Sequence, residues 1–189
     1  NLNNLFSYEV IRDPIIEDYF FNISEKLNID HVSTYLVRDN SANAFVINNN
    51  IYFTTGLLKL INNEDTLKAI YLHEYGHIIK KHFLSKKIEI QQSNRKSTFF
   101  SMFSVGLAVL TSNTNLGIGT SITLNSKLIE EISHHSVNFE IEADNFMIEQ
   151  IKKNKINTLE LISFLNRPVD QNVNYFISHP RNDERINNL

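Results

Sequence analysis

The chain has 189 residues, of which 42% are hydrophobic and 21% are charged, and its formal net charge is -3. This length and composition are typical of one domain with a substantial core, so we interpret residues 1–189 as a single domain. The slight negative charge, without a basic stripe, argues against nucleic-acid binding, and the absence of cysteine excludes disulfides and thiolate metal sites.

The first elements predicted along the chain are one helix and three strands. Asp13 followed by Pro14 is typical of a helix start, and apolar residues at helical spacing continue to Leu27. Strands are predicted over 33–38, 44–47 and 51–54. The last two strands are joined by three Asn residues at 48–50, which tolerate positive φ and therefore predict a hairpin. A short helix or turn over 56–61 follows.

The most informative motif is HEYGH at positions 73–77, within a predicted helix whose first turn is rich in Asn and acidic residues. On a helix, His73 and His77 project from one face, and this spacing lets two imidazole nitrogens reach one zinc ion. Glu74 lies beside the metal, where it can take a proton from a zinc-activated water. The motif therefore predicts a zinc site with Glu74 as its general base.

Residues 97–126 carry no charged side chain. Their apolar core, 99–110, is about 12 residues long, which is short of the roughly 20 that a membrane-spanning helix needs. One interpretation is a buried helix and loop over the active site. The other is a flap that faces a membrane or gates substrate entry. The sequence leaves both open.

A third zinc ligand is predicted in a second long helix, which runs from about 124 or 136 to 153 and carries EIEAD at 140–144. On this helix Glu140 and Asp144 share a face, so Glu140 can be the third ligand. Asp144 can accept the N–H of a zinc-bound His and fix its tautomer. The alternative is an ordinary acidic helix surface, but the HEYGH motif favours the zinc site.

Two small residues predict close packing. Gly76 lies inside its helix at a cost of about 1 kcal/mol relative to Ala, which usually marks a place where something must approach closely. Ala143 is small and would let the second helix pack close to the HEYGH helix. Glu142 and Glu149 are predicted to be solvated. Four histidines without a partner motif are predicted to make surface or local contacts: His31, His82, His134 and His135.

Further helices are predicted over 158–166 and 183–188, after which the chain ends. The predicted fold is α+β and mainly helical, with a small antiparallel sheet.

HEYGH followed by EIEAD resembles the HtpX/BepA-like zinc metallopeptidases, gluzincins related to the CAAX prenyl and Oma-type proteases. The hairpin region 43–58 and the C-terminal HP…ERI pattern at 179–186 are also similar, and the likeness spans residues 8–189 in the family's order. It is strongest to the soluble periplasmic BepA type, because the transmembrane helices of HtpX are absent. The chain departs from the pattern at 135–139, where the family often has Ser-Arg, and at 49–50, where it has Gly-Gly.

The resemblance implies a zincin-like domain with one zinc per chain and its sheet beside the zinc helix. It implies that Asn43, Ala44 and Phe45 lie on the strand to which a polypeptide substrate adds. It also implies that His179 comes close to the zinc, where it fills the open position in a latent enzyme or helps to stabilise the oxyanion. A helix-capping or loop histidine is the alternative for His179.

The sequence thus predicts a zinc endopeptidase with His73, His77 and Glu140 as ligands and Glu74 as base. A latent, chaperone-like zinc protein is an alternative, and a purely structural metal domain is disfavoured because it would not need Glu74.

From the resemblance alone we expect substrates among misfolded envelope proteins, a periplasmic or envelope location, and association with a membrane or envelope proteins. The chain begins with Asn1 and not Met, so we expect a trimmed sequence without its signal or anchor, and the tetratricopeptide half of BepA is not expected in it.

Overall fold

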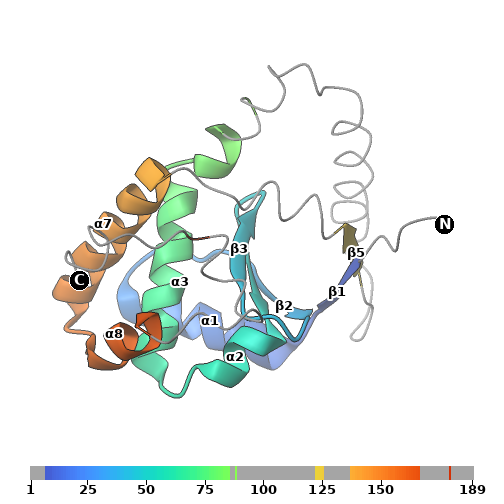
Figure 1. The fold of residues 1–189 in the computed structure, drawn as a ribbon, viewed down its shortest axis with the longest axis horizontal. Helices are drawn as coiled ribbons and strands as arrows, with labels where there is room; N and C mark the ends of the chain where they lie inside the picture. The colour runs from blue at the N-terminus through green and yellow to red at the C-terminus, as the bar shows by residue number, and fades with distance from the viewer. Residues whose placement is uncertain (1–6, 86–87, 89–121, 126–136, 167–178, 180–189) are drawn as a thin grey trace.

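The computed structural model describes residues 7–85, 88, 122–125, 137–166 and 179 (Figure 1). The helices are α1 (Pro14–Leu27), α2 (Thr55–Leu60), α3 (Glu64–Ile79), α7 (Val137–Asn154) and α8 (Leu159–Leu165). The strands are β1 (Ser7–Ile11), β2 (Thr34–Arg38), β3 (Ala44–Ile47), β4 (Asn50–Thr54) and β5 (Ile122–Asn125). The helix predicted over 183–188 and most of the uncharged segment lie outside the described residues.

The strands form one mixed sheet in the order β3-β4-β2-β1-β5. β2 and β4 are parallel, whereas the other neighbouring pairs are antiparallel. The predicted antiparallel sheet is therefore wrong in this respect. The physical reason is the connection that follows β2. The carbonyls of Asp39 and Ser41 accept hydrogen bonds from the Thr55 and Thr54 hydroxyls at the end of β4, so β4 lies beside β2 and leaves β3 at the edge.

The predicted hairpin between β3 and β4 is confirmed. Asn48 and Asn49 have φ of 49° and 62°, and Ile47 pairs with Asn50 across the turn. Two consecutive positive φ values give a turn whose twist matches that of the flanking strands. The Asn residues therefore set the register that leaves Ala44 near the open edge of the sheet.

Two strands differ from the sequence-based expectation. β1 was not predicted, and residues 122–125, expected in a helix, loop or flap, form β5 antiparallel to β1. A helix that starts at 124 is thus excluded, and α7 begins at Val137. Both strands are short and pair with segments far away in the chain, so no local pattern indicates them.

The core joins α1, α3 and the sheet through stacked aromatic rings. Phe20 of α1 stacks on Phe53 of β4 and on Tyr71 of α3, with centroid separations of 5.0 and 5.2 Å. The Tyr71 hydroxyl lies 2.8 Å from the Ser24 hydroxyl, so the polar end of this ring also has a partner in the core. These contacts hold α3 rigidly against the sheet.

The helix α3 lies between α7 and the edge strand β3 (Figure 1). A Cβ atom added to Gly76 would meet the Cα and O atoms of Ala143 at 3.0 Å, so the predicted close approach is confirmed. This contact brings the HEYGH and EIEAD motifs to adjoining surfaces. In the part of the chain that the structure describes, no helix combines the length and hydrophobicity needed to cross a membrane.

Candidate functional site

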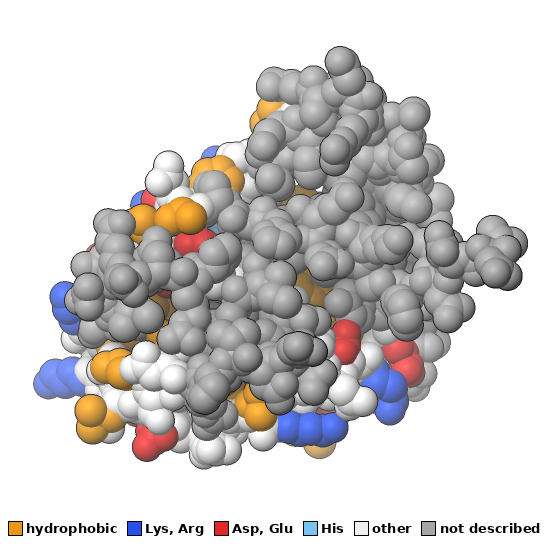
Figure 2. Space-filling model, in the orientation of Figure 1, with side chains coloured by type: hydrophobic (Ala, Val, Ile, Leu, Met, Phe, Trp, Pro, Cys, Tyr) orange, Lys and Arg blue, Asp and Glu red, His pale blue; other side chains and the backbone are white. Residues whose placement is uncertain are grey.

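The HEYGH motif lies in the buried C-terminal half of α3. The helix starts at its N-cap Asn63, whose side chain accepts a hydrogen bond of 2.7 Å from the Thr66 N–H. His73, Glu74 and His77 are all essentially inaccessible to solvent, with exposed fractions of 1%, 0% and 0%. On the face shown in Figure 2, by contrast, described acidic and basic side chains are interspersed around the rim. The buried side chains of His73, Glu74 and His77 therefore require polar partners inside the protein.

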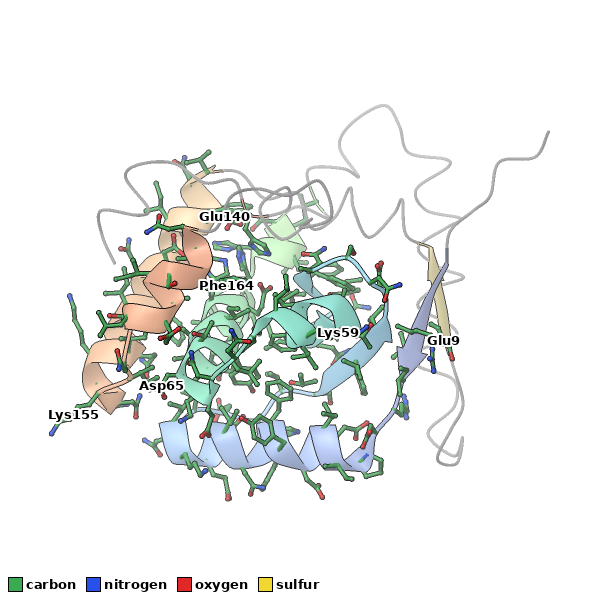
Figure 3. The ribbon with its side chains drawn as sticks, turned by 60° about the horizontal axis from the view of Figure 1, so that its bottom comes forward. Glu9, Lys59, Asp65, Glu140, Lys155 and Phe164 are labelled. Carbon is green, nitrogen blue, oxygen red and sulfur yellow. The ribbon has the colours of Figure 1, made fainter. Side chains whose placement is uncertain are left out.

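The donor atoms of three residues converge where α3 meets α7, near Glu140 in Figure 3. The Nε2 atoms of His73 and His77 are 3.1 Å apart. Glu140 brings Oε2 to 3.3 Å from His73 Nε2 and Oε1 to 3.4 Å from His77 Nε2. Adjacent ligand atoms of a tetrahedral zinc ion with bonds of about 2.0–2.1 Å lie about 3.3–3.4 Å apart. The two imidazole nitrogens and the carboxylate are therefore close enough to one another to bind one metal ion.

His179 occupies the fourth side of this cluster. Its Nδ1 lies 3.2 Å from His73 Nε2 and 3.0 Å from Glu140 Oε2. Its Nε2 lies 3.3 Å from Glu74 Oε1 and 3.2 Å from the Ala44 carbonyl oxygen. One donor atom from each of His73, His77, Glu140 and His179 lies within 4.8 Å of all the others. His179 thus contacts the predicted ligands and the predicted base together.

Asp144 approaches the outer nitrogen of His73. Its Oδ1 lies 2.8 Å from His73 Nδ1, and the residue is 5% exposed. When Nδ1–H donates to this carboxylate, the lone pair of Nε2 points into the cluster. The structure therefore brings Asp144 to the position expected of a group that selects the His73 tautomer.

Charges in the cluster shift its pKa values strongly. Burial lowers the pKa of His73, but the carboxylates of Asp144 and Glu140 outweigh burial and raise it to about 10. Burial also lowers the pKa of His179, but the charges of Glu140 and Glu74 outweigh burial and raise it. Burial raises the pKa of Glu140, but His179 and His73 hold it well below its usual value. Without a metal, imidazole protons balance the carboxylates, and a bound cation would replace them.

His82 was expected to make surface or local contacts, and the expectation of a surface position is wrong. The residue is 1% exposed, and its Nδ1 lies 2.9 Å from His77 Nδ1. Its ring stacks on Phe139 with centroids 4.2 Å apart and planes 7° apart. Burial lowers the pKa of His82 although the nearby Glu142 opposes this shift.

The expectation that Glu142 is solvated is confirmed, because its side chain is 51% exposed. Its Oε2 also lies 3.3 Å from His82 Nε2, a contact that was not expected. His31 is exposed and makes a local edge-to-face contact with Phe21, as predicted. His134 and His135 lie outside the described residues. A turn that redirects the chain after α3 explains why the sequence did not reveal His82.

The predicted substrate strand runs along the cluster. Asn43 accepts a hydrogen bond of 3.0 Å from the Thr54 N–H, so in the alternating ladder the Ala44 carbonyl points away from β4. This carbonyl is the group that contacts His179. The Phe45 ring instead stacks on Tyr52 in the sheet, with centroids 5.3 Å apart. The backbone of this segment, more than its side chains, therefore reaches the site.

Comparison with known proteins assigns the family. The model of Peptidase family M48 matches residues 12–189. The chain belongs to peptidase family M48. The resemblance inferred from the motifs is thus confirmed at the level of the peptidase family.

Two relatives carry the name beta-barrel assembly-enhancing protease (BepA). The protein from Yersinia pestis is 26% identical over 95% of this chain and 39% of its own length. The protein from Escherichia coli (strain K12) is 25% identical over 87% of this chain and 35% of its own. This M48 chain therefore spans somewhat more than a third of these relatives. The crystal structure of S. mikatae Ste24p is similar with a TM-score of 0.48 at 17% identity, covering 96% of this chain and 51% of its own.

Proposed function

We propose that this chain is a zinc-dependent endopeptidase that hydrolyses peptide bonds with activated water. The observation that carries the proposal is the convergence of His73, His77 and Glu140 at separations of 3.1–3.4 Å, with Glu74 buried beside them. Membership of a peptidase family supports it. Two imidazoles and a carboxylate, without thiolates, are also the donor types of catalytic zinc sites.

Each residue has a defined task in this proposal. His73, His77 and Glu140 would hold the zinc, and Asp144 would keep His73 in the tautomer that binds it. A zinc ion supplies Lewis acidity, which polarises the substrate carbonyl and makes water acidic enough to ionise near neutral pH. These three residues would leave the fourth side of the cluster for water and substrate.

Glu74 moves the proton. It accepts a proton from the attacking water as the new C–O bond forms, and it delivers this proton to the amine as the C–N bond breaks. Its Oε1 lies 3.3 Å from Nε2 of His179, whose Nδ1 faces the ligand atoms, so this carboxylate borders the fourth side of the cluster. No covalent enzyme intermediate is required.

A polypeptide substrate would add to the edge strand β3 at Asn43, Ala44 and Phe45. The outward carbonyl of Ala44, beside the cluster, supports this placement. Backbone hydrogen bonds to an edge strand hold an extended peptide without regard to its side chains. The scissile carbonyl would then lie close to Glu74.

In the present arrangement His179 would hold the enzyme latent. It contacts His73, Glu140, Glu74 and the Ala44 carbonyl, which are the groups that zinc, water and substrate must use. Cleavage then requires that His179 leave. The latent, chaperone-like alternative would be this state made permanent, and the relatives' printed name, a protease, does not favour it.

We further propose a role in quality control of envelope proteins, with a periplasmic or envelope location. The relatives' name refers to β-barrel assembly, but this chain spans only part of their length. Fractionation of cells that express the full-length protein tests the location. Recovery in the cytoplasm would contradict it.

The decisive test of the peptidase proposal combines metal analysis with casein hydrolysis. In a His179→Ala background, which we expect to raise activity, Glu74→Gln should retain one zinc and lose about 10²–10⁴-fold in hydrolysis. Glu149→Gln, an exposed change on α7, is the matched control. Unchanged hydrolysis by Glu74→Gln, or no zinc in the wild-type chain, would overturn the proposal. No gain from His179→Ala alone would overturn latency.

A further inference from the structure

The chain turns directly after α3, and His82 contacts His77. On a continuous helix the fifth residue along lies about 140° around the axis, so His82 would face away from His77. Instead Lys81 adopts φ of 57°, and the Lys80 and Lys81 N–H groups bond to the carbonyls of Gly76 and Ile78. This left-handed residue ends α3, and a new helical turn begins at His82.

The hydrogen bonds from His77 outward have one consistent direction. If His77 Nε2 presents its lone pair to the cluster, its Nδ1 carries the proton and donates to His82 Nδ1 at 2.9 Å. His82 Nε2 then carries the other proton and donates to Glu142 Oε2 at 3.3 Å. Each donor meets an acceptor, and the chain ends on a carboxylate.

The helix α7 holds His82 on two sides while it contributes to the cluster. Phe139 and Glu142 are three residues apart, so they share a face of α7. Phe139 stacks on the imidazole, and Glu142 accepts its hydrogen bond. Glu140, between them in sequence, points to His73 and His77. One turn of α7 thus carries the predicted ligand Glu140 and also the two residues that hold His82 behind the ligand His77.

We infer that His82 and Glu142 are positioning residues that orient His77 and increase its basicity toward zinc through a carboxylate–imidazole–imidazole relay. A carboxylate bonded to the outer nitrogen of a ligand histidine is the usual arrangement. Here a second imidazole is inserted, so the carboxylate acts from half-exposed surface. This inference rests on the proposed zinc site.

The test is the zinc dissociation constant of the purified chain, measured by competition with a chromophoric chelator. His82→Phe keeps a ring against Phe139 but removes both hydrogen bonds, and it should weaken zinc binding about 10–100-fold. His82→Asn retains an acceptor near His77 and should recover part of that loss. Glu142→Gln should weaken binding less than His82→Phe does, and more than the exposed control Glu149→Gln.

Thermal unfolding of the metal-free proteins separates positioning from a structural role. Glu142→Gln and Glu149→Gln should unfold at the same temperature without metal and differ only in zinc affinity. If His82→Phe does not fold, this pair decides the question. If every folded variant of His82 or Glu142 binds zinc as tightly as Glu149→Gln does, the relay is overturned but the zinc site is not. A folded wild-type chain that binds no zinc would overturn the zinc site and the relay together, which is a distinguishable result.

Discussion

The two histidines of α3 are supported in different ways. His73 donates directly to the buried carboxylate of Asp144, whereas His77 reaches Glu142 only through His82. Both carboxylates come from α7, yet one is enclosed by protein and the other is half-exposed. In a low-dielectric interior a charge interacts strongly with its neighbours, and salt changes this interaction little. Salt screens the interactions of an exposed charge. The His73 side should therefore be the stronger and less adjustable support.

The largest expected effect is the pH dependence of the metal-free protein. The carboxylates of Asp144 and Glu140 raise the pKa of His73 to about 10 from the usual 6.5 of histidine. A group with a raised folded-state pKa stabilises the fold fully below about pH 6.5, and this contribution disappears as pH rises toward about pH 10. We expect urea unfolding to show stability falling in this window by at most about 1.4 kcal/mol per pH unit for one proton.

Zinc should reverse this trend. Zinc binding displaces the proton from His73, so zinc affinity should rise with pH over the same window. Asp144→Asn removes one of the carboxylates that raise the pKa, and it should flatten the stability curve of the metal-free protein. A metal-free wild-type protein that becomes more stable between these pH values would contradict the charge arrangement described for His73.

The next effect distinguishes the two supports directly. Asp144→Asn should weaken zinc binding about 10–100-fold, and by more than Glu142→Gln. Chelator competition at low and high salt measures both. High salt should reduce the effect of Glu142→Gln and leave that of Asp144→Asn nearly unchanged. Equal effects with equal salt dependence would show that exposure does not separate the two sides.

Gly76 tests the spacing on which both supports depend. A Cβ there would push α3 and α7 apart by a few tenths of an ångström against the Ala143 backbone. Overpacking costs about 1–3 kcal/mol, which the better helix propensity of Ala offsets by about 1 kcal/mol. We expect Gly76→Ala to lower the free energy of unfolding and to weaken zinc binding.

The control for Gly76→Ala is Asn145→Ala, at an exposed position of α7, which changes helix propensity alone. Urea unfolding in chelator and zinc titration check both variants. A Gly76→Ala protein that is more stable than wild type and binds zinc normally would mean that the helices have room to adjust.

The smallest expected effect concerns Lys81, whose left-handed conformation redirects His82 toward His77. Glycine adopts this conformation without strain, so Lys81→Gly should change unfolding by no more than about 1 kcal/mol. Lys81→Val should be less stable, because β-branched residues are strongly disfavoured there, and should bind zinc more weakly. Thermal unfolding and zinc titration distinguish the two. Equal zinc affinity of both variants would show that the conformation of Lys81 is not needed for His82 to support zinc binding.

Much of the site was determined by local sequence. The spacing of His73 and His77 puts them on one face of any helix, and the same holds for Glu140 and Asp144. The Asn pair of the hairpin selects its turn by tolerating positive φ. Gly76 indicated a close helix contact before the structure identified its partner. These features depend on neighbours within a few residues, so periodicity and turn chemistry are sufficient to predict them.

Only the tertiary structure determined the remaining features. The parallel pairing of β2 with β4 and the addition of β5 depend on how long connections close, which no short pattern encodes. His179 lies far along the chain from the groups that it contacts, so the family resemblance and no local pattern pointed to it. His82 is close to His77 in sequence but reaches it only because the left-handed Lys81 ends α3 and Phe139 of α7 stacks on the His82 ring. The sequence by itself thus determined which donor atoms could act together, whereas packing of separate segments decided which of them meet.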